Sequence, residues 1–133
     1  MMVLVLDASV VACWILPDEQ NARADLSLNA METTSAFVPD IWDYEIRNLL
    51  LMNERRGRIS PETAAAGLSF LSALPIGAER IGNMDLVLDL ARKHRLTFYD
   101  AAYLELAMRK GAALATLDTA LASAARAEGL ETV

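Results

Sequence analysis

The sequence predicts an α/β fold, a three-layer α/β/α sandwich around a central parallel sheet of four to five strands. Short apolar runs at 3–6 and 112–116 have the length and composition of strands that are buried on both faces. Longer segments with apolar residues at helical spacing separate the strands, and this alternation favours a parallel sheet covered on both faces. A chain of 133 residues is the size of one domain, which we expect to span residues 1–133.

Composition narrows the class of protein further. Hydrophobic residues make up 54% of the chain, but no apolar run reaches the roughly 18–20 residues of a membrane span. No basic segment precedes the first apolar run, so we expect a cytoplasmic protein without a signal peptide. The single cysteine, Cys13, lies on an apolar helix, and we expect a buried thiol. A net charge of −6 argues against a generic nucleic-acid binder and suits a basic partner.

Start and stop signals define the elements of the first half. The strand at 3–6 leads into a helix at 8–16, which the turn at Pro17 ends. We expect a second helix at 19–30 with Ala22, Leu26 and Ala30 on one face, and then a short strand at 35–38. Asp40 is the expected cap of a third helix that runs to about 53 and is broken at 57. A Ser-Pro pair at 60–61 opens a fourth helix that ends at 74.

The second half continues the same alternation. A weak strand candidate at 76–79 is followed by a helix at 84–94 that Asn83 caps, with Leu86, Leu90 and Ala91 facing inward. His94, the only histidine, lies in the last turn of this helix, where a cation is favoured, so we interpret it as structural. Thr97 caps a sixth helix, which ends at Gly111. The strand at 112–116 precedes a last helix from 118 to about 129, and residues 130–133 would form a final edge strand.

The first strand ends on Asp7. Open α/β sheets keep their ligand crevice at the carboxyl ends of the strands, which is where this carboxylate lies. Asp is also a good N-cap, and Asp7 directly precedes a helix. Taken alone, the residue fits either interpretation equally well, and the decision depends on whether other carboxylates arrive at the same place.

Glu45 lies within an apolar stripe of the third predicted helix. Ile41, Leu49 and Met52 occupy the same face at i−4, i+4 and i+7, and Asn48 lies one turn further on. A glutamate inside such a stripe is unfavourable unless another group pairs with it. Alternatively, Glu45 lies at the edge of the stripe and extends to water.

Two further acids follow strands or begin helices. Asp100 lies in the first turn of the sixth helix, where it also fits a capping box with Thr97. Asp118 follows the strand at 112–116, where it also fits a plain N-cap. All parallel strands share one carboxyl edge, so Asp7 and Asp118 meet there, and the helices that carry Glu45 and Asp100 pack beside it. We therefore expect the four carboxylates to converge.

Four carboxylates in one crevice require compensation. Two unit charges ~5 Å apart repel by roughly 3 kcal/mol at an effective dielectric constant near 20, so either some protons stay bound or a cation binds. Oxygen ligands without His or Cys suit a hard ion, Mg²⁺ or Mn²⁺. Such an ion can activate water and neutralise charge on a phosphate, as phosphodiester hydrolysis requires. The sequence has no Ser-His-Asp arrangement, glycine-rich phosphate loop or zinc-type spacing that would support another chemistry.

Four segments, in this order, resemble the motifs of PIN-domain ribonucleases, specifically the VapC-type toxins of bacterial toxin–antitoxin pairs. No single segment is specific, but together they form a strong signal that covers nearly the whole chain. The segments are Leu-Asp-Ala-Ser at 6–9, Glu-Ile-Arg-Asn at 45–48, Leu-Thr-Phe-Tyr-Asp-Ala-Ala-Tyr-Leu at 96–104, and Thr-Leu-Asp at 116–118 with the Ala-rich helix after it.

The resemblance implies a Mg²⁺-dependent endoribonuclease, with Mn²⁺ as a substitute ion, in a three-layer fold. Ser9 and Thr116 match small hydroxyl positions that support such a site, and Asn48 joins them as a supporting residue. The resemblance also implies a homodimer, and a cognate VapB-type antitoxin whose tail covers the acidic crevice. The implied catalytic and metal-binding residues are Asp7, Glu45, Asp100 and Asp118.

Other readings use the same residues. A PIN-fold nuclease of RNA processing or DNA cleavage has the same chemistry, and a catalytically silent domain would only bind its partner. A phosphatase that uses Asp7 as its nucleophile requires a second acid two residues later, where this chain has Ser9. Trp14 and Trp42 are expected in the core rather than at an interface. Arginines around the end of the third helix could touch RNA phosphates or simply form a basic helix terminus; they are Arg47, Arg55, Arg56 and Arg58.

Overall fold

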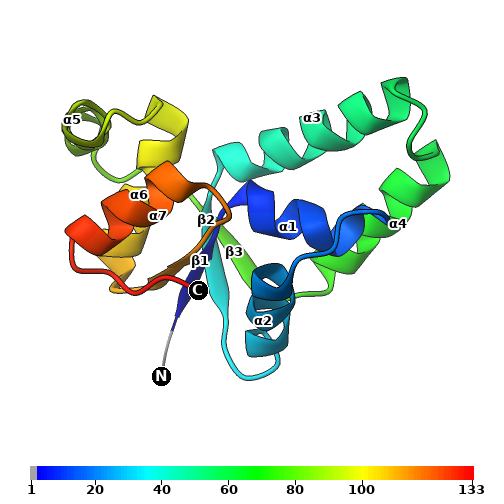
Figure 1. Cartoon of the computed structure of the whole chain (residues 1–133), viewed down its shortest axis with the longest axis horizontal. Helices are drawn as coiled ribbons and strands as arrows, with labels where there is room; N and C mark the ends of the chain where they lie inside the picture. Colours follow the sequence, from blue (N-terminus) through cyan, green and yellow to red (C-terminus); the bar gives the residue numbers. More distant parts are fainter. Residues whose placement is uncertain (1–2) are drawn as a thin grey trace.

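The computed structural model describes residues 3–133 and has a four-stranded, fully parallel sheet at its centre (Figure 1). The strand order is β3-β2-β1-β4, so β1 lies between β2 and β4. The predicted parallel sheet is confirmed, and the weak candidate at 76–79 forms one of its two edge strands. The strands are β1 (Leu4–Leu6), β2 (Ala36–Pro39), β3 (Ile76–Glu79) and β4 (Ala113–Ala115).

Helices cover both faces of the sheet (Figure 1). On one side lie α5 (Met84–His94), α6 (Phe98–Lys110) and α7 (Thr119–Ala127). On the other side lie α1 (Ala8–Ile15), α2 (Ala22–Ala30), α3 (Ile41–Arg55) and α4 (Pro61–Ser72). The centre of the core is α6, in which the residues 101–107 are all buried. No helix within residues 3–133 combines the length and the apolar character that crossing a membrane requires.

Most helix ends lie where local signals place them. The side chains of Ser60, Asn83 and Thr97 each accept a backbone N–H from the first turn of α4, α5 and α6. Gly111 ends α6 at φ +60°, in the left-handed region that glycine adopts without strain. Asp40 occupies the N-cap position of α3 without a side-chain capping bond, and α3 continues two residues beyond the predicted end, to Arg55.

The prediction for α2 is wrong in its start, and the face that carries Leu26 is not the buried one. The helix begins at Ala22, because Asn21 caps it through the N–H groups of the next turn. Its buried residues are Ala24 and Ser27, whereas Leu26 is 62% exposed. The indole N–H of Trp14 on α1 donates to the carbonyl oxygen of Ala24 at 2.8 Å. This bond joins α1 to α2, whose buried side chains are small.

Smaller corrections concern other faces and the end of the chain. On α5 the buried residues are Val87, Leu90 and Ala91, and Leu86 lies at the exposed edge of that arc. Residues 130–133 do not form a strand: a single bridge joins Leu114 to Thr132, because β4 offers only three residues for pairing. The fourth helix ends at 72 rather than 74.

The structure also tests two predictions about single residues, the buried thiol of Cys13 and the structural role of His94. Cys13 is partly exposed, not buried as expected. His94 is structural, as predicted: its Nε2 lies 2.7 Å from Glu128 Oε2, and Lys93 Nζ reaches the same oxygen at 2.7 Å. These two partners lower the pKa of Glu128, and they tie the end of α5 to the end of α7.

Candidate active site

Asp7 lies at the carboxyl end of the central strand, and hydroxyl groups from two elements hold it. Its backbone N–H donates to the carbonyl oxygen of Ala115 at 2.9 Å, so the pairing of β1 with β4 continues as far as Asp7. The carboxylate is buried, and its Oδ2 accepts hydrogen bonds from Ser9 Oγ at 2.8 Å and Thr116 Oγ1 at 2.7 Å. Neither bond occupies Oδ1. Asp7 makes no side-chain capping bond to α1, so the N-cap alternative does not explain it.

Burial dominates the electrostatics of Asp7. It raises the pKa of this carboxyl group, because the charged form loses its hydration. The hydroxyl groups of Thr116 and Ser9 oppose this effect, and the negative charge of Asp118 adds to it. Ser9 and Thr116 also fix the next loop, since Ser9 Oγ accepts the N–H of Leu117 and Thr116 Oγ1 accepts that of Asp118, both at 3.0 Å. The two predicted hydroxyl residues therefore contact both the acid and the backbone beside it.

Glu45 is held from the opposite side of the site by Tyr103. The phenol O–H of this fully buried tyrosine donates to Glu45 Oε1 at 2.6 Å. Glu45 itself is half-buried, beside the fully buried face of α3 that Ile46 and Leu50 form. It therefore lies at the edge of the apolar stripe, but it is paired instead of extending freely to water. Sequence reasoning missed this role of Tyr103, although the residue lies one turn after Asp100 on the same face of α6.

The pKa of Glu45 is raised, first by burial and then by the charges of Asp7 and Asp100. The hydrogen bond from Tyr103 opposes the rise, because it stabilises the ionised carboxylate. Burial and the adjacent Glu45 charge raise the pKa of Tyr103 far above its ordinary range. The phenol thus stays protonated and serves only as a donor to Glu45.

Asp100 and Asp118 approach from the helix starts. Burial raises the pKa of Asp100, and the charges of Asp7 and Asp118 raise it further. Thr97 accepts the N–H of Asp100 at 3.1 Å, so the threonine is the cap of α6. Asp118 does cap α7, through its Oδ1 and the N–H of Leu121 at 3.1 Å. Its side chain is otherwise exposed.

These four acids share one electrostatic environment. Each of Asp7, Glu45 and Asp100 has a pKa raised in part by the charge of at least one other member of the set. Among residues 3–133, however, no three Asp, Glu, His or Cys side chains form a ready-made metal shell. The oxygen-only donor set fits a hard ion that keeps part of its water shell, as Mg²⁺ does. Direct binding of one ion by all four acids stays a prediction.

The predicted supporting residue Asn48 and the predicted phosphate contact Arg47 both lie apart from the four acids. Asn48 is exposed on α3 and, within the described part of the chain, makes no hydrogen bond to the acids. Arg47 lies on the opposite face of α3 from Arg56, where its Nη1 donates to the carbonyl oxygen of Asp43 at 3.0 Å and lies 3.7 Å from its Oδ1. Arg47 therefore does not form one cluster with the arginines that follow α3.

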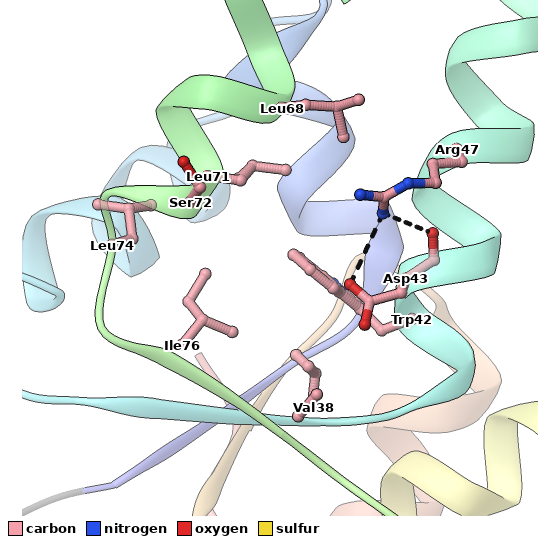
Figure 2. Close-up of a pocket in the computed structure, with 10 residues that line it drawn as sticks. Val38, Trp42, Asp43, Arg47, Leu68, Leu71, Ser72, Leu74 and Ile76 are labelled. Atoms are coloured by element: carbon pink, nitrogen blue, oxygen red, sulfur yellow. Dashed lines mark hydrogen bonds and ion pairs between the residues drawn. The ribbon is translucent and has the colours of Figure 1, made fainter. Parts of the chain in front are cut away.

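Arg47 instead borders a separate cavity of about 240 Å³ between α3, α4 and the strands β2 and β3. Figure 2 shows Leu68 and Leu71 entering it from α4 and Ile76 from β3, with the Arg47–Asp43 pair at its margin. Trp42 also lines this cavity and is only 7% exposed, which places it in the core as predicted. None of the four acids lines this cavity.

Comparison with known proteins identifies chains of the same fold and sequence pattern. The model of the PIN domain family matches residues 4–127. Ribonuclease VapC3 of Pyrobaculum aerophilum is 34% identical over 125 residues, which are 91% of this chain and 93% of that protein. The crystal structure of PAE2754 from the same organism has a TM-score of 0.74 at 26% identity, covering 99% of this chain and 91% of the other. VapBC2 from Rickettsia felis, solved bound to a DNA fragment from their promoter, has a TM-score of 0.68 at 11% identity, covering 99% and 98%.

Proposed function

Because the chain belongs to the PIN domain family, we propose that its acidic edge is the active site of a metal-dependent endoribonuclease that acts as the toxin of a toxin–antitoxin pair. The proposed catalytic and metal-binding acids are Asp7, Glu45, Asp100 and Asp118. The observation that carries the proposal is the mutual influence of these acids, since burial and the charge of neighbouring acids raise the pKa of three of them. Such clusters mark functional sites more often than structural ones.

The proposed metal is Mg²⁺, with Mn²⁺ as a substitute. When bound, the ion would supply a nucleophilic water and charge neutralisation at the scissile phosphate. The protein supplies the rest: Ser9 and Thr116 fix the Asp7 carboxylate through Oδ2, and Tyr103 fixes Glu45 through Oε1. The second oxygen of each carboxylate is then oriented for a cation or for its bound water.

The alternative functions use the same geometry less well. Phosphatase chemistry needs a second acid two residues after the nucleophilic Asp7, but Ser9 donates a hydrogen bond to Asp7 there. A silent binding domain would not need four mutually repelling acids at one edge. A PIN-fold nuclease of RNA processing or of DNA cleavage shares the proposed chemistry, and only the choice of substrate separates it from a toxin.

The partners follow from the family. We expect a VapB-type antitoxin as the partner of this chain, with a tail that covers the acids. RNA as the substrate, a homodimer of the chain and a cytoplasmic location complete the proposal. The whole chain, 1–133, would form a single PIN domain.

RNA cleavage by the purified chain tests the proposed function directly. We expect cleavage of single-stranded RNA in Mg²⁺ or Mn²⁺, no cleavage in EDTA, and recovery when excess Mg²⁺ is added back. Single-stranded DNA of the same sequence is the control substrate. Cleavage of DNA in preference to RNA would favour the DNA nuclease, and metal-independent or absent cleavage would contradict the proposal.

Replacing Tyr103 by Phe should weaken metal binding without unfolding the protein. The variant removes only the O–H group that fixes Glu45, so the pKa of Glu45 should rise further and its orientation should loosen. Loss of such a supporting contact typically lowers metal affinity or activity by about 10- to 100-fold. Mn²⁺ binding, followed by electron paramagnetic resonance, measures the affinity apart from cleavage.

Tyr44→Phe is the matched control, because Tyr44 is 75% exposed on the same helix as Glu45. We expect this control to bind Mn²⁺ like the parent. Equal Mn²⁺ affinity in the parent and in the Tyr103→Phe variant would show that the bond to Glu45 only stabilises the packing of α3 on α6.

A further inference from the structure

A groove of about 490 Å³ runs between α1 and α3 and begins beside the acids. At this end it is lined by Ser9, which donates to Asp7, and by Leu117, which precedes Asp118. In Figure 1, α1 and α3 extend together from the sheet toward the turn that leads into α4. We call this feature the α1–α3 groove. It lies next to the proposed active site through Ser9 and Leu117, although none of the four acids lines it.

One face of α3 connects Glu45 to the far end of the groove. Leu49, Met52 and Arg56 line the groove and follow Glu45 at i+4, i+7 and i+11. This spacing keeps them on one side of the helix, and eleven residues span roughly 16 Å along its axis. The groove thus has one end beside the acids, an apolar middle and a basic far end.

The basic end consists of Arg56 and Arg58, which both line the groove. Both side chains are exposed, and within residues 3–133 neither guanidinium group forms an ion pair or a hydrogen bond. Several other cations of this acidic chain form ion pairs, Arg47 with Asp43 and Arg92 with Asp89 among them. Within residues 3–133, however, the side chains of four further arginines also form none: Arg23, Arg55, Arg80 and Arg95. One carboxylate, that of Glu19, lies along the same groove, but it pairs with neither arginine.

The helix dipole of α3 explains the position of Arg56 but not that of Arg58. Arg56 is the C-cap of α3, where a cation interacts well with the helix dipole. Arg58 lies outside the helix, beyond Gly57, whose φ of +72° turns the chain. Its N–H donates to the carbonyl oxygen of Asn53 at 3.0 Å, which returns the chain toward α3. This turn places a second guanidinium group in the groove, a position that the helix dipole does not require.

We propose that the α1–α3 groove binds the single-stranded RNA substrate on one side of the cleaved bond. Arg56 and Arg58 bind backbone phosphates, because a guanidinium fork matches phosphate oxygens. The apolar surface of Leu49 and Met52 receives a base, and the strand reaches the acids past Ser9 and Leu117. This inference rests on the proposed function and adds a strand path to it. An acidic peptide is the competing occupant, but it would leave the connection to the acids unexplained.

The test compares two double variants that remove the same charge. The variant Arg56→Ala/Arg58→Ala removes both guanidinium groups from the basic end of the groove. The control Arg23→Ala/Arg80→Ala removes two exposed arginines that do not line the groove. A fluorescent single-stranded RNA of about 12 nucleotides is the probe. Fluorescence anisotropy in EDTA measures RNA binding without cleavage over a series of salt concentrations, and thermal melts check that each variant is folded.

We expect binding by Arg56→Ala/Arg58→Ala to be on the order of tenfold weaker than that of the parent at low salt. The slope of log K against log salt should fall by about 1.4, because each phosphate contact of a single strand contributes about 0.7. In Mg²⁺ the KM for RNA should rise while kcat changes little. Arg23→Ala/Arg80→Ala should keep the parental slope and KM.

Equal RNA binding by the two double variants would overturn the proposed strand path. A polyglutamate probe is the second check. If Arg56 and Arg58 are needed to bind polyglutamate but not to bind RNA, the strand path is also overturned. Failure of the proposed function is distinguishable from this result. One outcome is that the parent binds RNA without cleaving it, with a dependence of log K on log salt that falls when Arg56 and Arg58 are replaced. In that case the groove inference holds and the nuclease assignment fails. If the parent cleaves RNA and the two double variants behave alike, only the groove inference fails.

Discussion

Replacing Asp100 by Asn is expected to abolish RNA cleavage, with a loss on the order of 100-fold or more, and to raise the melting temperature of the metal-free protein. The amide keeps the shape of the carboxyl group but removes one charge from a mutually repelling set. Burial and the charges of Asp7 and Asp118 already raise the pKa of Asp100, so its ionised form is unfavourable in the folded state. About 1 kcal/mol of relief corresponds to roughly 4 °C in a domain of this size.

The raised pKa values also determine how the stability of the metal-free protein depends on pH. The carboxyl groups of Asp7, Glu45 and Asp100 have folded-state pKa values above their ordinary values of 3.8, 4.5 and 3.8. The folded state therefore binds protons more tightly than the unfolded state does. Without metal, stability should rise as the pH falls through the raised pKa values toward the ordinary ones, and Asp100→Asn should remove part of this rise.

Thermal melts in EDTA, at neutral pH and at about pH 5, measure both effects, and a gel assay in Mg²⁺ measures cleavage. Asp18→Asn is the matched control, because Asp18 is exposed in the loop after α1 and carries the same charge. A melting temperature of Asp100→Asn well below that of the parent would assign Asp100 to capping α6. Retained cleavage would remove it from the active site.

Local sequence signals predicted the elements that carry the acids. The helices α5 and α6 lie where Asn83, Thr97 and Gly111 place their ends, because caps act within one turn of the chain. Asp7 follows the apolar run of β1, and the shared carboxyl edge of a parallel sheet predicts that Asp118 lies near it. These parts depend on interactions between residues close in sequence or on the topology of the sheet.

The missed features depend on tertiary contacts. The hydrogen bond from Tyr103 to Glu45 joins residues 58 positions apart, and the residue pattern of neither helix predicts it. The helix α2 packs on α1, where the indole N–H of Trp14 donates to the carbonyl oxygen of Ala24, and Leu26 lies exposed. By contrast, no tertiary contact is needed to separate Arg47 from Arg56, since nine residues turn a helix by about two and a half turns and place the two on opposite faces of α3.

The antitoxin is expected to place an Arg or Lys side chain in the acidic site, near Asp7 and Asp100. A cation from the partner would relieve the same repulsion that Mg²⁺ relieves, so the two should compete. Arginine is the better candidate, because its planar fork pairs with a carboxylate through two hydrogen bonds. Replacing that arginine by Ala should weaken binding more than replacing it by Lys, and added salt should slow association.

Calorimetric titration of the chain with a peptide from its cognate antitoxin, at rising Mg²⁺ and constant ionic strength, measures this competition. If the two share the site, Mg²⁺ at about 100 times its dissociation constant should weaken peptide binding by about 100-fold. Asp100→Asn should also weaken peptide binding, while Asp18→Asn should not. Peptide affinity that stays constant while Mg²⁺ saturates the free site would show that the peptide leaves the metal position open. Inhibition would then act by covering the approach to the acids, because a side chain that does not replace the ion cannot relieve the repulsion among Asp7, Glu45 and Asp100.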